Sequence, residues 1–439
     1  MKSLKPPKPL KPLNPPNPAE PTRSPKLLQP APQPKPPRHL HATDLRAAAS
    51  LATQATAGLV DLVEAVHARI ATLPMTGPAP ERTRGITGLV YKTVRGTTRI
   101  VGGSLDALLG WLEPTVKNSA NGLATPEREA FLAALNGVLG DHLAATANAL
   151  ATPMTLRVNG QPLVLEREAL AAALPAANGR VLVLLHGLCM NDLQWQRAGH
   201  DHGAWLAQQA GWTPVYLRYN SGLSIADNGQ QLSALLAALT TAWPQPSQET
   251  RAITRLALLG HSMGGLVSRS AIHAGRQAGL AWTQTLTDLV CLGTPHHGAP
   301  LERAGHGLDL LLQATPYSAP FARLGQLRSA GITDLRHGRL LASDGATAMQ
   351  RTPVPLPAGV QCHALAASLS TEGLESQEAT GRRLRGDGLV PVASALGQHA
   401  DPKFDLGFAP GRQGVVYGTG HLDLLSSPVV AQHLMRWLG

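Results

Sequence analysis

The pentapeptide Gly-His-Ser-Met-Gly at residues 260–264 constrains the fold of this 439-residue chain more than any other feature. It lies between an apolar run, Leu256–Leu259, and a stretch with helical spacing that begins at residue 263. A Gly-x-Ser-x-Gly turn at such a junction forms a tight strand-to-helix bend that exposes the serine hydroxyl above the sheet, and its glycines remove side chains that would collide there. The motif therefore predicts that Ser262 is a nucleophile.

Short apolar segments alternate with helical segments from residue 154 onward. The helical segments include 228–242 and 263–277, and a hairpin centred on Asn159-Gly160 is expected over 154–165. This alternation predicts an α/β fold with a mostly parallel sheet covered by helices on both faces. The expected strands are 180–185, 214–219, 256–259, 289–292 and 362–367.

A serine nucleophile needs a base to take its proton and an acid to orient that base. For this kind of turn the expected order along the chain is serine, acid, histidine. Asp387 lies in a turn-like segment just past an apolar strand, and His421 lies in another near the C-terminus. We therefore predict a triad of Ser262, Asp387 and His421. Three rival acids fit less well, because two lie in a polar loop and one is too close to His421: Asp401, Asp405 and Asp423.

Acyl transfer through a tetrahedral intermediate also requires backbone N–H donors for the oxyanion. The helix that starts after Ser262 offers the N–H of Met263, and the loop after strand 180–185 offers the N–H of Leu188. These two donors are the predicted oxyanion hole.

The other histidines near these motifs are expected to have structural roles. His261 should pack away from the cleft, and His186 should hold its loop by hydrogen bonding. His296 and His297 should shape a loop or line the substrate pocket.

Five blocks of sequence, in this order, resemble those of bacterial triacylglycerol lipases and of GPI inositol-deacylase-like hydrolases in the α/β-hydrolase superfamily. The resemblance covers roughly residues 175–439, and it implies the α/β-hydrolase fold together with the triad and oxyanion residues given above. The blocks are LLHGL at 184–188, GHSMGG at 260–265, LGTPHHGAP at 292–300, GDGLVPVASALG at 386–397 and GHLDLL at 420–425.

No cofactor and no metal are predicted. Some bacterial lipases of this kind bind calcium through an acid two positions after the histidine, which would be Asp423. Ser427 stands where those enzymes offer a further side-chain ligand, so we expect Asp423 to order the histidine loop or to cap the helix after it.

The first 38 residues differ sharply in composition from the rest. They hold 14 of the 36 prolines, eight basic residues and one acid, so seven of the ten net positive charges lie there. We predict a disordered Pro/Lys-rich arm over 1–40, a solubilising tail in preference to a docking or lipid-anchoring segment. Because the rest of the chain is nearly neutral and carries no recognition motif, we exclude nucleic-acid binding.

The predicted domains are the arm at 1–40, a helical region at 41–152 and the catalytic domain at 153–439. Within the helical region, apolar spacing indicates helices near 43–75 and 84–113, and a third begins clearly at Thr125-Pro126-Glu127. We expect this region to pack on the catalytic domain. Residues 299–345 are expected to form a helical cap over the serine, although part of them would serve equally well as ordinary helix covering the sheet edge.

The cysteine pattern favours a reducing compartment. Cys189, Cys291 and Cys362 are odd in number, far apart and without metal-ligand spacing, so we expect free thiols. No apolar run suits a signal peptide or a membrane span. A cytoplasmic protein is predicted, with peripheral membrane contact and oligomeric state left open.

Together these features predict a serine carboxylic-ester hydrolase that acts on a lipid or another small acyl ester. Two alternatives remain at this stage. The same triad could transfer the acyl group to an alcohol, or the fold could serve as a non-catalytic scaffold whose arm docks partners.

Overall fold

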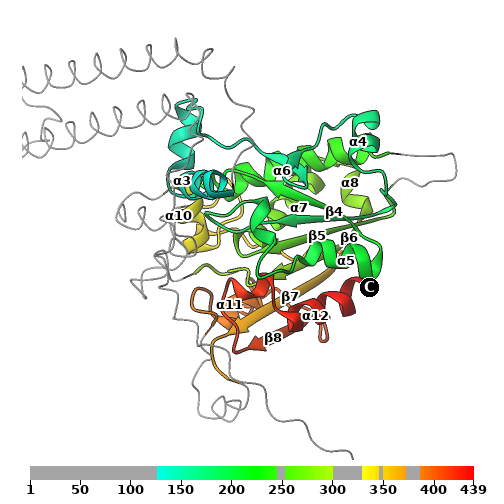
Figure 1. Ribbon diagram of the computed structural model, residues 1–439. Helices are drawn as coiled ribbons and strands as arrows, with labels where there is room; N and C mark the ends of the chain where they lie inside the picture. The colour runs from blue at the N-terminus through cyan, green and yellow to red at the C-terminus, as the bar shows by residue number, and fades with distance from the viewer. Residues whose placement is uncertain (1–125, 245–252, 300–328, 346–349, 372–385) are drawn as a thin grey trace, which may run out of the picture. The chain divides into compact units, whose positions relative to one another are not determined.

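The computed structural model describes residues 126–244, 253–299, 329–345, 350–371 and 386–439 (Figure 1). All described residues belong to the unit His39–Gly439. The predicted arm, the helices near 43–75 and 84–113, and most of the predicted cap lie outside the described residues.

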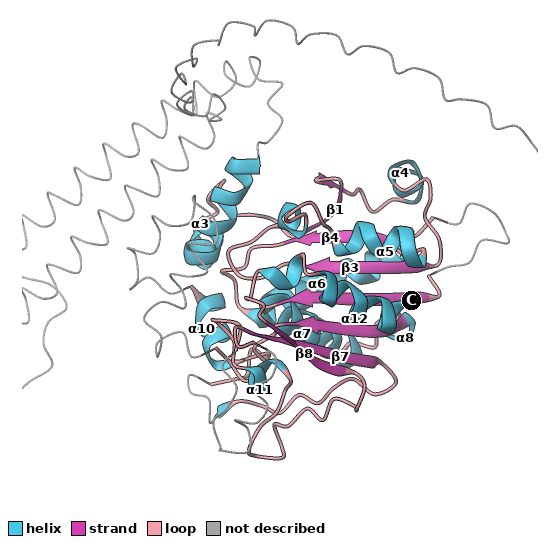
Figure 2. Ribbon diagram, turned by 60° about the horizontal axis from the view of Figure 1, so that its bottom comes forward, coloured by secondary structure: helices cyan, strands magenta, loops and turns pink. Residues whose placement is uncertain are grey.

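Within the described residues the strands form one sheet in the order β2-β1-β4-β3-β5-β6-β7-β8 (Figure 2). The first two strands form an antiparallel hairpin, and β1 also pairs antiparallel with β4, whereas all pairs from β4 to β8 are parallel. This confirms the mostly parallel α/β-hydrolase sheet. The strands are β1 (Thr155–Val158), β2 (Gln161–Pro162), β3 (Arg180–Leu185), β4 (Thr213–Arg218), β5 (Arg255–His261), β6 (Leu286–Leu292), β7 (Gln361–Ser368) and β8 (Gln413–Tyr417).

Local sequence explains the hairpin at the edge of this sheet. Asn159 and Gly160 have φ angles of 51° and 72°, the left-handed conformation that a two-residue type I′ turn requires at both positions. The turn sets Val158 opposite Gln161. The five strands expected from apolar runs are also present, each within a few residues of its predicted bounds.

Helices cover both faces of the sheet because the parallel strands bury side chains on both sides. In β3, Val181, Val183 and Leu185 join one apolar cluster, while Leu182 and Leu184 join the other. Helices α6 (Ile225–Ala242), α7 (Met263–Gln277) and α10 (Ala330–His337) contribute to the first cluster. Helices α5 (His202–Ala210) and α12 (Pro428–Leu438) contribute to the second, and lie together over the near face in Figure 2. The remaining short helices are η1 (Asp192–Trp195), α4 (Arg167–Ala173), α8 (Trp282–Thr285), α11 (Val392–Ala395) and η5 (Asp423–Leu425).

The third predicted helix is α3 (Pro126–Ala145), and it packs on the sheet domain. Val138 belongs to the main apolar cluster. Glu129 forms an ion pair with Arg218 at the end of β4, and both side chains are buried. The Ser329 hydroxyl, just before α10, donates to the Gly137 carbonyl at 2.7 Å. The described part of the N-terminal helical region is therefore continuous with the fold that follows.

Two further expectations concern the cysteines and membrane spans. All three cysteines are free and buried, as predicted. Across the part of the chain that the structure describes, every helix is too short or too polar to cross a membrane.

Candidate active site

Ser262 occupies a strained bend between β5 and α7. Its φ and ψ are 54° and −122°, a conformation that costs a non-glycine residue about 1–3 kcal/mol and that clusters at functional sites. Two flanking glycines allow the bend. A β-carbon on Gly260 would collide with the backbone of Gly265, and one on Gly264 would collide with the Leu185 carbonyl at the end of β3. The Ser262 N–H donates to the Leu292 carbonyl at 2.8 Å, which fixes the bend to β6.

Asp387 and His421 form a short hydrogen bond at the same edge of the sheet. The His421 Nδ1–H donates to Asp387 Oδ2 at 2.7 Å, and both residues are at least 97% buried. The second oxygen, Asp387 Oδ1, accepts from the N–H groups of Leu389 at 3.0 Å and Val390 at 2.8 Å. Asp387 Oδ2 is therefore left to hold the His421 imidazole in a fixed orientation.

The charge state of Asp387 follows from these contacts. Burial by itself would raise the pKa of this carboxyl, but the nearby His421 and the two backbone donors lower it below its ordinary value. Asp387 is therefore ionised at neutral pH and keeps the proton of the imidazole on Nδ1. The opposite nitrogen, His421 Nε2, is buried and has no hydrogen-bond partner among the described residues. An unprotonated Nε2 is the atom that a general base would use.

Gly293, the residue after β6, lies beside the Asp387–His421 pair. A β-carbon on Gly293 would lie 3.2 Å from Asp387 Oδ2 and 3.3 Å from His421 Cε1. The residue before it, Leu292, accepts the hydrogen bond from the Ser262 N–H. The side chains of Asp387 and His421, 34 positions apart in the sequence, are thus in contact, and the backbone of Ser262 is bonded to the same region through Leu292.

His261 has a role that sequence reasoning did not foresee in detail. We expected it to pack away from the cleft, and it is fully buried, but its Nε2 contacts the His421 carbonyl at 3.0 Å and the two rings lie 4.8 Å apart. Burial lowers the pKa of His261 to about 3, so the ring is neutral and Nε2–H is the donor. His261 thereby fixes the main chain of His421 to the end of β5. Its place beside Ser262 at a strand end was the available signal.

The loop after β3, which contains the predicted oxyanion donor Leu188, approaches Ser262 closely. A β-carbon on Gly187 would lie 3.1 Å from the Ser262 β-carbon, so only glycine allows this approach without displacement. Leu188 and Met263 are both buried. Among the described residues, no acceptor takes the backbone N–H of either one. The two predicted donors therefore remain available on the two sides of the nucleophile.

His186 holds this loop, as expected. Its ring stacks on Tyr219 at 4.2 Å between centroids, and its Nδ1 contacts the Gly187 carbonyl at 2.8 Å. The Tyr219 hydroxyl donates to the His186 carbonyl at 2.8 Å. Burial lowers the pKa of His186 to about 4, so the ring is neutral and its Nδ1–H donates to Gly187.

The oxyanion loop continues into a contact with α3. Cys189 has a φ of 59°, and its N–H donates to the Ser221 hydroxyl at 3.0 Å. A β-carbon on Gly137 of α3 would collide with the Cys189 sulfur and would lie 3.0 Å from the Cys189 Cα. Asn220, in the neighbouring loop, donates to the Gly140 carbonyl of α3 at 2.9 Å. The sequence alone did not place α3 at the site, because α3 contains no motif that indicates a contact with this loop.

The rival acids are engaged in ordering loops. Asp423 Oδ2 accepts from the Gly420 N–H at 3.1 Å and so orders the turn before His421, as expected. Asp401 accepts from the Lys403 N–H, and Asp405 from the N–H groups of His399 and Gly407. Among the described residues, no group of three or more acidic, histidine or cysteine side chains could hold a metal ion.

Comparison with known proteins agrees with this architecture. Residues 176–363 match the family model described as the PGAP1-like alpha/beta domain. This match covers β3 to β6 with the serine bend and ends in the first residues of β7, and it confirms the predicted resemblance to lipase-class α/β-hydrolases. No curated protein matches the chain.

Three solved structures show how distant the structural likenesses are. The mature lipase BlEst2 of Bacillus licheniformis is 19% identical over 65% of this chain and 99% of its own, with a TM-score of 0.41. The metagenomic carboxyl esterase MGS0156 is 17% identical over 74% of this chain and 98% of its own, with a TM-score of 0.33. Lipase B of Aspergillus fumigatus is 11% identical over 63% of this chain and 54% of its own, also with a TM-score of 0.33. At these scores the likenesses carry no functional inference.

Proposed function

We propose that this chain is a serine hydrolase that cleaves carboxylic esters of the lipid or acyl-ester class. The observation that carries the proposal is the short Asp387–His421 hydrogen bond, with an unpartnered His421 Nε2, at the sheet edge where Ser262 is held in a strained bend. In the proposed triad Asp387 occupies one ring nitrogen of His421, and the other is left for the proton of the nucleophile.

In the proposed reaction His421 Nε2 takes the hydroxyl proton of Ser262 as the serine oxygen attacks the ester carbonyl. The carbonyl oxygen becomes an oxyanion, which the N–H groups of Leu188 and Met263 stabilise. The imidazolium then gives its proton to the leaving alcohol, and an acyl-serine remains. A water molecule, activated by the same nitrogen, attacks the acyl-serine and regenerates Ser262.

Replacement of Ser262 by Ala tests the proposal directly. We expect Ser262→Ala to lose turnover of a p-nitrophenyl acyl ester and labelling by a fluorophosphonate while it stays folded by circular dichroism. Ser427→Ala is a matched control, because Ser427 precedes α12 without a side-chain capping bond, and it should keep both activities. Equal turnover by wild type and Ser262→Ala would refute the proposal, and a folded wild type that fails to label would favour a non-catalytic scaffold.

Acyl transfer to an alcohol is the second reaction open to the same triad. Product analysis with and without an added alcohol distinguishes it, because a hydrolase yields the free acid in both cases. A dominant transferred ester at low alcohol concentration would replace hydrolysis by acyl transfer as the main activity.

A further inference from the structure

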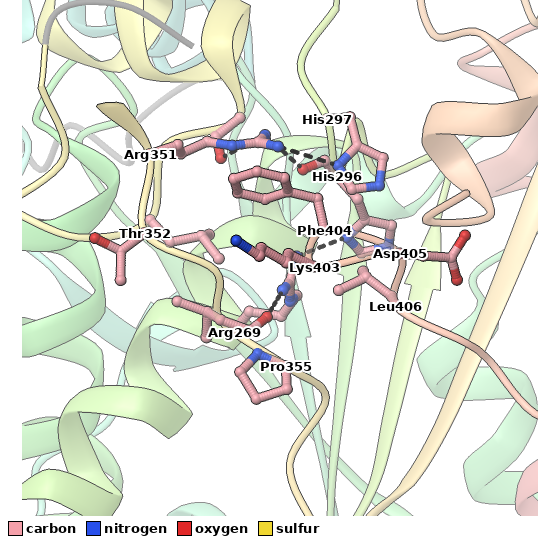
Figure 3. A pocket seen from close by; sticks show the side chains of 13 residues that line it. Arg269, His296, His297, Arg351, Thr352, Pro355, Lys403, Phe404, Asp405 and Leu406 are labelled. Carbon is pink, nitrogen blue, oxygen red and sulfur yellow. Dashed lines mark hydrogen bonds between the residues drawn. The ribbon is translucent and has the colours of Figure 1, made fainter. Parts of the chain in front are cut away.

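A pocket lined by residues of α7 and of the loops after β6 and α11 gathers three cationic side chains. Arg269 comes from α7, Arg351 from the segment before β7, and Lys403 from the loop after α11. In Figure 3 the Lys403 ammonium lies between the two guanidinium groups. His296 and His297, from the loop after β6, complete the polar wall.

The acids near this pocket do not neutralise it. Asp405 is the acidic residue among those that line it, and in Figure 3 its carboxylate points to the side away from the two arginines. Its oxygens accept backbone N–H groups within its own loop. Asp344 acts on Arg351 electrostatically, but its oxygens accept the N–H groups of Leu340, Leu341 and Thr352. The pocket therefore keeps an excess of positive charge.

Both arginines are fixed in place by contacts that leave their charge uncompensated. Arg351 donates to the carbonyls of His296 at 3.3 Å and His337 at 3.1 Å, and its guanidinium stacks 4.8 Å from the Phe404 ring. Arg269, which is 4% exposed, donates to the Val354 carbonyl and to His296 Nδ1. Burial and the charge of Arg351 both lower the pKa of Arg269, to about 10. Neutral partners satisfy hydrogen bonds, but they do not cancel a buried charge.

The histidines of the wall are neutral and add no negative charge. Because an arginine can only donate, His296 and His297 both accept at Nδ1, from Arg269 and Arg351. Burial lowers the pKa of His296 well below its ordinary value and that of His297 to about 4. Each neutral ring then carries its proton on Nε2, and both of these nitrogens are buried, so the two rings add no negative charge to the pocket.

The position of the pocket relates it to the nucleophile. Arg269 lies seven residues after Ser262 on α7, which corresponds to about 10 Å along the helix axis and to the same helix face. His296 lies four residues after the Leu292 carbonyl that holds the Ser262 N–H. A group bound beside Arg269 would therefore lie about two helical turns along α7 from Ser262.

We propose that this pocket binds a phosphate group carried by the ester substrate, so that the preferred substrates are phosphate-bearing acyl esters. Three converging cations suit the several terminal oxygens of a tetrahedral phosphate better than a neutral alcohol headgroup. The proposal about substrates rests on the proposed ester hydrolysis, whereas phosphate binding by the pocket does not.

Lys403 is the residue to change, because it is exposed and its side chain can be replaced without disturbing the core. Lys403→Met keeps the length of the side chain without its charge, and Lys403→Glu reverses the charge. Arg436→Ala on α12 is the matched control, since it removes one exposed positive charge from a helix that does not line the pocket.

The first measurement is binding of inorganic phosphate by calorimetry at low salt. We expect Lys403→Met to weaken binding about tenfold, Lys403→Glu to abolish it, and Arg436→Ala to leave it unchanged, since a charge-assisted hydrogen bond carries about this much affinity. Absence of phosphate binding to wild type, or equal binding by wild type and Lys403→Glu, would refute the proposal that this pocket binds phosphate.

The second measurement compares kcat/KM for dihexanoyl phosphatidic acid with that for the neutral dihexanoylglycerol, both below their micellar concentrations. Wild type should prefer the phosphate ester about tenfold or more, Lys403→Glu should lose that preference, and Arg436→Ala should keep it. If phosphate binds but wild type shows no preference, the site holds free phosphate and the substrate proposal is wrong. If wild type neither labels nor turns over either ester, the proposed hydrolysis fails while the binding measurement still decides the pocket.

Discussion

The proposed nucleophile and base are held by the sheet itself, whereas the proposed oxyanion loop is held by a helix that precedes the sheet in the sequence. Ser262, Asp387 and His421 lie at strand ends, and backbone hydrogen bonds to Leu292, Val390 and Asp387 fix them. Leu188 lies in a loop whose next residue packs on α3 at Gly137. The proposed chemistry therefore depends on two supports, the sheet and α3. Each support can be disturbed while the other stays intact.

The largest effect is expected from Asp387→Asn, which breaks the sheet-held side. An amide in place of the carboxylate no longer holds the proton on His421 Nδ1, so the free nitrogen becomes protonated and the base is lost. We expect kcat for a p-nitrophenyl ester to fall by about 10⁴-fold, with the fold intact by circular dichroism. Asp401→Asn, at an acid that bonds only within its own loop, should have no such effect, and a larger loss from Asp401→Asn than from Asp387→Asn would reverse the assignment of the acid.

A smaller loss of activity is expected from Gly137→Ala, which disturbs the contact of α3 with the oxyanion loop. Alanine favours the helix, but its β-carbon collides with Cys189 and displaces the oxyanion loop. We expect kcat to fall by about 100-fold with little change in KM, because a displacement near 1 Å costs this much. The control is Ala144→Val, which adds bulk at an exposed position of the same helix, and equal activities of the two variants would mean that α3 does not support the loop.

Low pH should destabilise both supports, because each contains a buried neutral histidine. His261 belongs to the sheet, and His186 belongs to the oxyanion loop. The folded protein lowers the pKa of His186 to about 4 and of His261 to about 3, whereas the unfolded chain takes up these protons near pH 6.5. Below that pH the unfolded state binds more protons, so the free energy of unfolding falls as pH falls. Stability is complete above about pH 6.5 and is lost progressively toward pH 4, by about 3 kcal/mol from His186 alone.

Urea denaturation between pH 7.5 and 4.5 measures this loss. His186→Asn, whose amide can replace the Nδ1–H donor to Gly187, should unfold with a shallower pH dependence than wild type. The same slope in both proteins would mean that His186 is not buried as a neutral ring.

The smallest effect concerns the cysteines, and it reports on the contact between α3 and the oxyanion loop. Burial raises the pKa values of the Cys189, Cys291 and Cys362 thiols to about 12, so almost no thiolate is present at neutral pH. Native wild type should therefore react negligibly with a thiol reagent and keep full activity. In Gly137→Ala we expect only Cys189 to become reactive, detected by mass spectrometry of peptides, whereas reaction at all three would indicate general unfolding.

Much of the fold could be read from local sequence, and the exceptions have physical reasons. The apolar runs predicted β3 to β7, and Asn159-Gly160 predicted the hairpin, because strand and turn preferences are local. β8 was not predicted, since Gln413–Tyr417 is short, contains a glycine and becomes a strand through its pairing with β7.

The candidate site divides in the same way. Turn chemistry and chain order singled out Ser262, Asp387 and His421, because a nucleophile bend needs particular residues at fixed spacing. The support of the oxyanion loop by α3 and the bond from His261 to the His421 carbonyl had no comparable signal. The sequence alone does not distinguish a glycine that allows a close contact between two segments from any other glycine.

By itself the sequence determined the α/β architecture, the position of the serine bend and the residues that can form a triad, since these depend on local propensity, apolar periodicity and motif spacing. Only the tertiary structure decided that α3 braces the oxyanion loop and that Arg269, Arg351 and Lys403 converge in one pocket. These contacts join segments separated by tens of residues or more, and such proximity is set by how the helices and loops pack on the sheet.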